Sequence, residues 1–414
     1  MSFQQGLSGL NASSKALDVV GNNIANSGTV GFKSANAAFA DVYAASLGAG
    51  NQIGIGTSVM STDQRFTQGN ITVTDNSLDM AINGQGFYRM DNNGVISWTR
   101  NGQFSVDKDG YVVDGNGYRL TGYMADPTSS IIVTTTPVDL YIDPADLQPQ
   151  PTGFTGDGLE VGLNLDSRDT TFGVAPAFNT ADPTTYNYST TATVYDSLGN
   201  PHLMAMYFRK GDGTAGVPVN TWQVYTSLDG GAVGAPTPMT FSTTGGLLTP
   251  AGGIIPQNFA VTTGATTPLA FDLNLTGTTQ YGNSFGVNSI SQDGYTTGRL
   301  AGINVASDGV IEGRYSNGET RALGQVILGN FANPNGLVSL GNNQWAESAD
   351  SGQPVLGEPG SGTRGILQSA AVEESNVDLT QELVNLITFQ RMYQANAQTI
   401  KTQDSIMQTL VNLR

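Results

Sequence analysis

Two glycine-rich stretches carry residue types that bind ligands in other proteins. The first, "DKDGYVVDGNG" at Asp107–Gly117, places carboxylates much as a calcium loop does. Its glycine comes too early for an EF-hand, and no bidentate glutamate closes it. Asp-Gly and Asn-Gly pairs between short apolar runs are typical of β-hairpin turns. We therefore predict consecutive hairpins here and no metal site.

The second stretch, "GSGTRG" at Gly360–Gly365, matches the GxGxxG pattern of dinucleotide-binding proteins. That pattern binds a pyrophosphate where a strand precedes the loop and a helix follows it. Here the flanking residues are Gly, Pro and Ser, with no strand pattern before the loop. We predict a loop without a cofactor.

Groups for covalent or acid–base catalysis are scarce. The chain has no cysteine, which excludes disulfides, zinc thiolates and cysteine nucleophiles. Its one histidine, His202, starts a predicted strand without a GxSxG elbow, so we expect a solvated or core-edge side chain. Scattered carboxylates leave a glycosidase pair open, but they do not cluster with aromatic residues. The sequence predicts a protein that is not an enzyme and has no catalytic, cofactor or metal residues.

The composition limits the partners and the architecture. The 414 residues suit two or three domains, and a net charge of −17 argues against nucleic acid as a partner. Charged residues make up only 12%, so Ser, Thr, Asn, Gln and Gly must cover the surface. We find neither a cleavable signal pattern nor an apolar run of roughly 20 residues, so we expect no membrane insertion.

Both ends of the chain have helical periodicity, over residues 2–27 and 376–412. Asn376 or Asp378 can cap the second helix, and Gly28 and Gly31 should end the first near Asn26. In each helix the apolar residues recur at spacings of three and four, as in a coiled-coil seam. The predicted seam residues are Phe3, Leu7, Leu10, Leu17 and Ile24, then Leu379, Leu383, Leu386, Tyr393, Ala397, Ile400, Met407 and Val411.

Two interpretations of these helices stay open. They could pack together as an ordinary antiparallel hairpin, or they could be a device for assembly. About a dozen seam side chains contribute roughly 1.5–3 kcal/mol each when buried. Ordering about 60 residues costs roughly 1–2 kcal/mol per residue. A single two-helix seam would be marginal, and other copies of the chain could supply the missing neighbours.

Short strands and turns fill the middle of the chain. Thr191–Tyr195 and Leu203–Phe208 predict one hairpin around a turn at Asp196–Pro201. We expect a mainly β fold with α-helical termini, in which a β domain over 146–279 is inserted in a second β domain built from 70–145 and 280–370. The family resemblance described below implies the rest of the layout: a coiled-coil-like helical core domain of 1–28 with 371–414, a connector of 29–69, and, outward from them, the inner β domain (70–145 with 280–370) and the outer one (146–279).

Three stretches resemble a known family. "GLSGLNASSKALDVVGNNIANSGTVGFKS", Gly6–Ser34, resembles the amino-terminal signature of bacterial flagellar rod and hook axial proteins. Thr67–Tyr88 and Ser375–Leu413 resemble the next block and the carboxy-terminal helix of the same family. The signature residues, Asn22, Asn23, Ile24, Ala25, Asn26, Gly31, Phe32 and Lys33, would turn the chain out of the helix.

Within that family the chain is most similar to hook proteins, because it has a large β insertion that distal rod proteins lack. A distal rod protein is the alternative within the class. A secreted β-rich adhesin or glycan-active protein is the alternative outside it. That alternative would need a carbohydrate pocket or paired acids, and a monomer with ordered termini.

The resemblance implies a structural subunit that leaves the cell unfolded through the flagellar channel. It implies self-assembly into a flexible helical tube, a universal joint that carries motor torque from rod to filament. The implied partners are other copies, the distal rod protein, the hook cap protein, the hook–filament junction protein and the flagellar type III export apparatus. The implied location is the extracellular hook at the cell surface, part of the bacterial flagellum beyond the basal body.

Overall fold

The computed structural model describes residues 2–42, 54, 56–127, 129–173, 175–213 and 221–412. Two compact units make up the chain. Unit 1 contains Met1–Pro144, Gly302–Arg314 and Thr320–Arg414, and unit 2 contains Ala145–Ala301 and Tyr315–Glu319. Strands predominate between two terminal helices, which confirms the predicted fold class.

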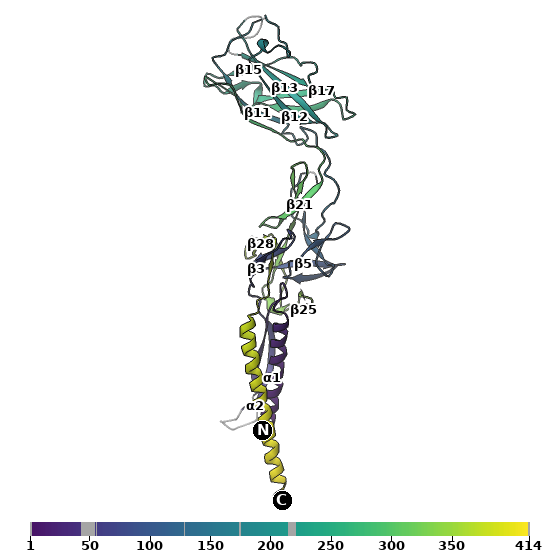
Figure 1. Ribbon diagram of the computed structural model, residues 1–414, viewed down its shortest axis with the longest axis vertical. Coiled ribbons are helices and arrows are strands. Elements are labelled where there is room, and N and C mark those ends of the chain that lie inside the picture. The colour runs from purple at the N-terminus through teal and green to yellow at the C-terminus, as the bar shows by residue number, and fades with distance from the viewer. Residues whose placement is uncertain are drawn as a thin grey trace. The chain divides into compact units, whose positions relative to one another are not determined.

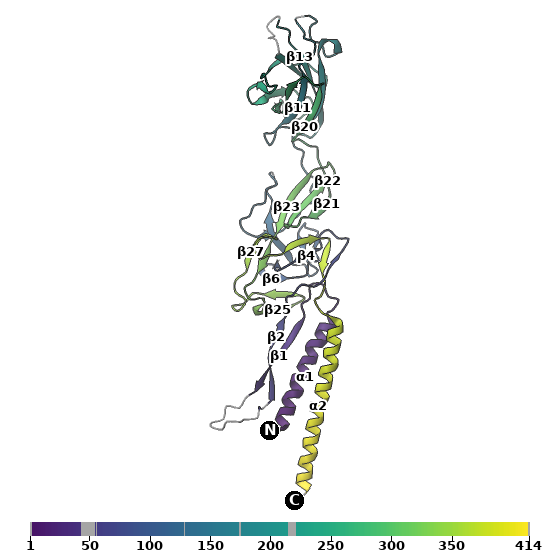
Figure 2. The same ribbon diagram turned by 90° about the vertical axis from the view of Figure 1, so that its left-hand side faces the viewer.

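Unit 1 begins with helix α1 (Ser2–Ala25) and ends with helix α2 (Leu379–Asn412). The two helices lie side by side and antiparallel (Figures 1 and 2). The Asp378 carboxylate caps α2 by accepting hydrogen bonds from the backbone N–H groups of Thr380 and Gln381. Of the two predicted caps, Asp378 is therefore correct and Asn376 is wrong, because the Asn376 side chain binds other segments.

Glycines let α1 and α2 approach closely. A Cβ added to Gly9 would lie 2.8 Å from Asn396 Nδ2, and one on Gly6 would lie 3.1 Å from Ile400 Cγ1. The buried positions of α1 include Ala12, Ser13 and Ala16, which are also small. Large apolar residues that we assigned to a seam, such as Phe3 and Leu7, remain about half exposed.

Between α1 and the rest of unit 1 the chain forms an antiparallel hairpin. Strand β1 (Ala35–Val42) pairs with β2 (Gly56–Gln64), and both contact α1 (Figure 2). Residues 29–69, the predicted connector, contain this hairpin. Residues 43–53 and 55 lie outside the described residues.

Besides the β1–β2 hairpin, the described β strands of unit 1 form one large sheet and two short pairs. Along the large sheet the order is β21-β22-β23-β9-β5-β6-β26-β25, with β7, β8, β10, β24 and β27 attached. The short pairs are β28 with β4 and β29 with β3. The bounds are β3 Ile71–Val73, β4 Met80–Asn83, β5 Phe87–Asn92, β6 Val95–Thr99, β7 Ser105–Val106, β8 Val112–Val113, β9 Arg119–Met124, β10 Val138–Asp139, β21 Leu300–Val305, β22 Val310–Tyr315, β23 Thr320–Val326, β24 Leu328–Asn330, β25 Val338–Gly341, β26 Gln344–Ala346, β27 Val355–Gly357, β28 Ile366–Ser369 and β29 Ala371–Glu373, with a 3-10 turn at Pro334–Gly336.

Asp107 and Asp114 shape successive turns in this unit. The Asp107 carboxylate accepts the backbone N–H groups of Asp109 and Tyr111, and Asp114 does the same for Asn116 and Tyr118. Strands β7, β8 and β9 pair on either side of these turns. The predicted consecutive hairpins are confirmed, and these two carboxylates act as turn acceptors.

Unit 2 is a sandwich of two sheets (Figure 1). One sheet has the order β17-β18-β11-β19, with β20 also paired to β11, and the other has the order β12-β13-β14-β15-β16. Alternate residues of β11, such as Leu163, pack against Met206 and Trp222 from the second sheet. The bounds are β11 Leu159–Asp166, β12 Tyr188–Tyr195, β13 Pro201–Lys210, β14 Thr221–Leu228, β15 Thr237–Phe241, β16 Leu247–Thr249, β17 Ile254–Phe259, β18 Leu269–Asn274, β19 Thr279–Tyr281 and β20 Gly286–Gln292, with 3-10 turns at Pro183–Thr185 and Ala251–Gly253.

The β12–β13 pair confirms the predicted hairpin. The predicted outer part, 146–279, lies within unit 2, which also includes residues 280–301 and Tyr315–Glu319. Residues 286–292 belong there because β20 pairs with β11 along most of its length. The four-part division of the chain stays a prediction. No helix among the described residues is long and apolar enough to cross a membrane.

The β13 strand offers a matched test of the sandwich core. Met206 is fully buried, whereas Leu203 on the same strand is 52% exposed. We expect Met206→Ala to lower the free energy of unfolding of unit 2 by about 2–5 kcal/mol, because it leaves a cavity. Leu203→Ala should change it little. Denaturant-dependent hydrogen exchange of the β12–β14 amides in the full chain measures both variants, and equal effects would contradict the described core.

Candidate functional site

Three passages of the chain lie together where the helices and the β1–β2 hairpin join the other strands of unit 1. They are residues 26–34, 64–70 and 373–378. We call this place the helix-exit junction. The side chains that hold it are Asn23, Lys33, Arg100, Glu373 and Asn376.

Asn23 joins the end of α1 to the start of β1. Its amide Nδ2 donates to the Ala35 carbonyl at 2.8 Å, and its Oδ1 accepts from the Ala35 N–H at 2.9 Å. Nδ2 also lies 3.3 Å from Glu382 Oε1 in the first turn of α2. The side chain is 1% exposed, so these partners replace water. An amide is needed at this position because it must donate and accept at once.

Asn22 and Asn26 form the turn that ends α1. The Asn26 Nδ2 donates to both the backbone carbonyl and the side-chain oxygen of Asn22, at 2.9 and 2.8 Å. The Thr29 hydroxyl then donates to Asn26 Oδ1. These local bonds satisfy groups that another helical turn would have used, so the helix ends at Ala25, next to the predicted end near Asn26 and two residues short of the full range 2–27.

Gly31 brings the chain back toward the end of β29. Its φ is +71°, its N–H donates to the Glu373 carbonyl at 2.8 Å, and a Cβ would lie 2.7 Å from the Asn101 nitrogen. Both the left-handed backbone and the close approach require glycine. Phe32 is buried next to it, while Ala25 and Asn22 are exposed. The signature residues thus meet at this junction, apart from those two exposed side chains.

Glu373 is the charged centre of the junction. Its Oε1 lies 2.6 Å from Lys33 Nζ and accepts the Gly69 N–H at 2.9 Å, and its Oε2 lies 3.3 Å from an Arg100 guanidinium nitrogen. All three charged side chains are at most 3% exposed. Lys33 also donates to the Thr67 carbonyl, and Arg100 to that of Gly84.

Burial is the main electrostatic influence on the two cations. It lowers the pKa of Lys33, and the Glu373 carboxylate opposes that shift. Burial likewise lowers the pKa of Arg100, again against the attraction of Glu373. One carboxylate therefore compensates two desolvated cations, and removing it would leave both without a counter-charge.

Asn376 connects the outgoing and returning passages. Its Oδ1 accepts the Ser34 N–H at 2.7 Å, and its Nδ2 donates to the Arg65 carbonyl at 2.7 Å and to Thr67 Oγ1 at 2.9 Å. One side-chain amide therefore holds residue 34, the segment 65–67 and the residues just before α2 together by hydrogen bonds. With these bonds made, the side chain is not available to cap the helix.

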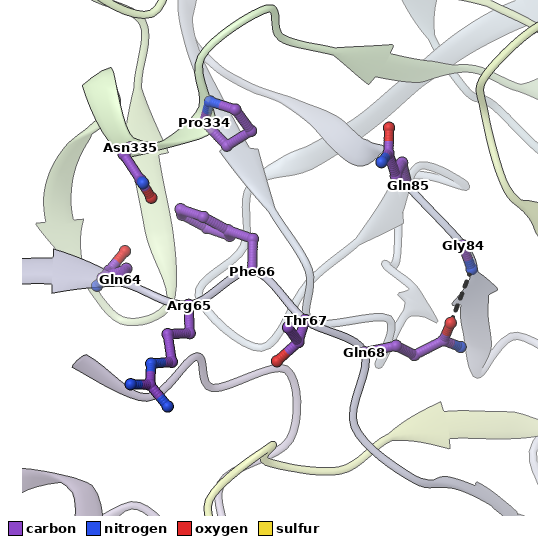
Figure 3. Close-up of a pocket in the computed structure, with 9 residues that line it drawn as sticks. All are labelled: Gln64, Arg65, Phe66, Thr67, Gln68, Gly84, Gln85, Pro334 and Asn335. Atoms are coloured by element: carbon purple, nitrogen blue, oxygen red, sulfur yellow. Dashed lines mark hydrogen bonds between the residues drawn. The ribbon is translucent and has the colours of Figure 1, made fainter. Parts of the chain in front are cut away.

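A cavity of about 620 Å³ opens beside the junction (Figure 3). Amides, backbone and Phe66 make up most of its wall, and Gln68 Oε1 accepts the Gly84 N–H across it. Among the residues that the structure describes, its lining includes no carboxylate and no histidine. The lining residues are Gln64, Arg65, Phe66, Thr67, Gln68, Gly84, Gln85, Pro334 and Asn335.

The two remaining candidate motifs lie elsewhere. The loop Gly360–Gly365 is followed by strand β28, where a dinucleotide site requires a helix. His202 lies in unit 2 between two carboxylates and is 7% exposed, so the expectation of a solvated side chain is wrong and that of a core-edge position holds.

The predicted assembly residues form two groups. Between 38 and 62% exposed are Phe3, Leu7, Leu379, Leu383, Tyr393 and Met407. Partly buried are Leu10, Leu17, Ile24, Leu386, Ala397 and Ile400. Val411 belongs to α2, but its side chain lies outside the described residues. Their role in contacts between copies stays a prediction.

Sequence reasoning missed Arg100 and Glu373. Glu373 follows the short apolar run Ala370–Val372 and precedes a second glutamate, Glu374, so the local sequence does not show which of the two is buried. The partner of Glu373, Lys33, is 340 residues away, which no local pattern reveals.

Four family models match the chain. Residues 3–33 match "Flagella basal body rod protein", and residues 81–145 match "Flagellar hook protein FlgE/F/G D1 domain". Residues 164–295 match "Flagellar basal body protein FlaE D2 domain", and residues 368–413 match "Flagellar basal body rod FlgEFG protein C-terminal".

Individual relatives agree with these models. The chain is 43% identical to the flagellar hook protein FlgE of Escherichia coli K12 over 426 residues, covering 100% of both chains. It is 31% identical to that of Borreliella burgdorferi, covering 100% of this chain and 99% of the relative. The crystal structure of Helicobacter pylori flagellar hook protein FlgE2 is similar in fold, with a TM-score of 0.53, 15% identity, and coverage of 72% of this chain and 99% of that one.

Glu373→Gln tests the junction. The substitution keeps the shape of the side chain but leaves Lys33 and Arg100 without a counter-charge. We expect the free energy of unfolding of unit 1 to fall by about 3–5 kcal/mol, which is the range for breaking a buried ion pair. Hydrogen exchange of the Gly31 and Gly69 amides in the full chain reports it. Glu374→Gln, at the exposed neighbouring position, is the control, and equal protection in both variants would contradict this role.

Proposed function

The chain belongs to the flagellar hook protein family, and on that premise we propose that it polymerises through α1 and α2 into the flexible tube of the hook. The observation that carries this proposal is the exposed apolar surface of the helices. Because glycines make the contact between α1 and α2, large side chains such as Leu7, Leu383 and Met407 are left in water. Such a surface is characteristic of a protein that binds further neighbours.

The polar residues of α2 also support packing on several sides. The hydroxyls of Thr388, Thr399 and Thr402 donate to the carbonyls four residues earlier, and Ser405 and Thr409 do the same. A hydroxyl that is already bonded within its own helix can be covered by an apolar neighbour without losing a donor bond. Over Leu379–Asn412 the charged residues are only Glu382, Arg391, Lys401 and Asp404, so few charges oppose burial.

The helix-exit junction gives the polymer its internal geometry. In this proposal the buried charges of Lys33, Arg100 and Glu373 keep one arrangement of the helices and the strands of unit 1, because any other would separate buried ions. Torque that enters through the helices would then pass into the β strands of unit 1 without a change in their relative placement. The weakly charged β surfaces would slide and rock on neighbouring copies while the curved tube turns.

The proposed surroundings follow from family membership. The chain would leave the cell unfolded through the flagellar type III export apparatus and assemble in the extracellular hook at the cell surface. Its neighbours would be other copies, the distal rod protein, the hook cap protein and the hook–filament junction protein. The role is mechanical and uses no catalysis. In the proposed division of labour, 1–28 with 371–414 forms the core of the tube, 29–69 connects, and 70–145 with 280–370 and 146–279 form its outer layers.

Leu383→Asp tests the role of the exposed helix surface. Leu383 is 45% exposed in the single chain, so the substitution should leave the chain folded. In a polymer it would bury an unpaired charge, which costs several kcal/mol. Since 1.4 kcal/mol is tenfold in an equilibrium constant, we expect the critical concentration to rise at least about tenfold. Electron microscopy and sedimentation of the purified chain measure it.

The matched control is Gln398→Asp, which adds the same charge at an exposed polar position of the same helix. A chain lacking residues 1–30 and 376–414 should form no tubes. If Leu383→Asp assembled at the same concentration as the unaltered chain, the exposed apolar surface would not be the assembly surface.

A further inference from the structure

His202 lies between two carboxylates in unit 2. Its Nδ1 is 2.6 Å from Asp229 Oδ2, and its Nε2 is 3.3 Å from Asp196 Oδ2. A neutral imidazole has one donor nitrogen and one acceptor nitrogen, so one of these contacts would set a lone pair against a carboxylate oxygen. Only the imidazolium donates to both partners.

We propose that His202 is held as an imidazolium and serves as a pH-sensitive latch for three loops at the end of unit 2 where the chain enters and leaves it. The latch consists of His202, Asp196, Asp229 and Thr263. It is separate from the helix-exit junction and does not depend on the proposed assembly.

Asp196 gathers two of the loops. Its carboxylate is fully buried and accepts the Asn200 N–H at 2.9 Å within the β12–β13 turn. It also accepts the Thr263 hydroxyl at 2.6 Å from the loop between β17 and β18. The Thr266 N–H, in the same loop, donates to Ser197 Oγ. The β12–β13 turn is therefore tied to the β17–β18 loop at two points.

Asp229 brings in the third loop. It follows β14, and its Oδ1 accepts the Leu203 N–H at 2.8 Å while Oδ2 contacts the histidine. The Asp229 N–H also donates to the Leu203 carbonyl at 2.9 Å, which extends the β13–β14 ladder to the start of the loop. The ring adds a contact that joins the Asp229 carboxylate to the Asp196 carboxylate in the β12–β13 turn.

The latched turn packs on the two segments that lead into and out of unit 2. A Cβ added to Gly199 would lie 2.6 Å from Pro149 Cβ and 3.2 Å from Thr296 Cα. Thr152 exchanges backbone and side-chain hydrogen bonds with Tyr195, at the start of the same turn. Loss of the latch contacts would therefore weaken the packing at the end of unit 2 where the chain enters and leaves it.

The direction of the pH dependence follows from the groups that face the ring. Burial favours the neutral ring, but hydrogen bonds to Asp229 and Asp196 outweigh it and raise the pKa of His202. Its stabilising contribution is complete below the unfolded pKa and is lost as the pH rises through the folded pKa. For Asp196 and Asp229, burial raises the pKa, and hydrogen bonds outweigh it and lower it, so their contribution is lost only in acid.

The chain has a single histidine, so its titration is unambiguous. We expect ¹³C-histidine NMR of the full chain to give a pKa above the ordinary value. Asp229→Asn should lower it by roughly 1 or more on the pH scale, because it removes an adjacent opposite charge. Asp272→Asn, an exposed position in the same unit, is the control and should leave it unchanged. The proposal is overturned if the pKa of His202 is at or below its ordinary value, or if Asp229→Asn does not lower that pKa.

Hydrogen exchange tests the mechanical half of the proposal in the unaltered chain. After correction for intrinsic rates, the amides of Asn200 and Leu203 should lose protection as the pH rises through the measured pKa of His202. The amides of the β17–β18 ladder should not. Unchanged protection at Asn200 and Leu203, or a uniform loss across unit 2, overturns the role as a latch.

Discussion

One buried carboxylate, Glu373, lies between Lys33 and Arg100, and the arrangement of unit 1 depends on it. The three side chains come from the exit of α1, the residue after β6 and the last strand before α2, so their contact fixes where α1 ends and where α2 begins relative to the sheet. Ion pairs of this kind add little net stability, because desolvation offsets attraction. Their effect is to raise the free energy of every other arrangement of these segments, because another arrangement would separate the buried charges. Asn23 and Asn376 act in the same way with neutral groups, each bonding backbone that would otherwise be unpaired.

The contact between α1 and α2 differs from the junction, because small residues make it close and no buried ion pair holds it in the described residues. Where α1 meets α2, Gly6 and Gly9 lie next to Ile400 and Asn396 of α2, so the two helices approach closely there. The larger side chains stay available, and this is why a chain with a well-defined junction can still present helices that need neighbours.

Much of this could be predicted from local signals. The helical periodicity placed both helices to within three residues, and the Asp-Gly and Asn-Gly turns predicted the hairpins around Asp107 and Asp114. The contacts over long sequence distances could not. Heptad spacing does not predict whether the Leu7 side chain contacts α2 or solvent. The residues near Glu373 in the sequence do not identify Lys33 as its partner. Similarly, residues 286–292 fall in unit 2 because of their pairing with β11, more than 100 residues away.

The hydroxyls that bond within α2 have a consequence for motion. A hydroxyl that donates within its own helix can still accept a hydrogen bond but donates none to an adjacent surface, so a neighbour at Thr388, Thr399 or Thr402 would be held more by shape than by directed bonds. Dispersion contacts change smoothly with displacement, whereas hydrogen bonds are lost within a few tenths of an ångström. A neighbouring helix could shift along such a surface in small axial steps with little friction. In the proposed curved tube, contacts of this kind would let neighbouring helices shift along one another as the tube turns.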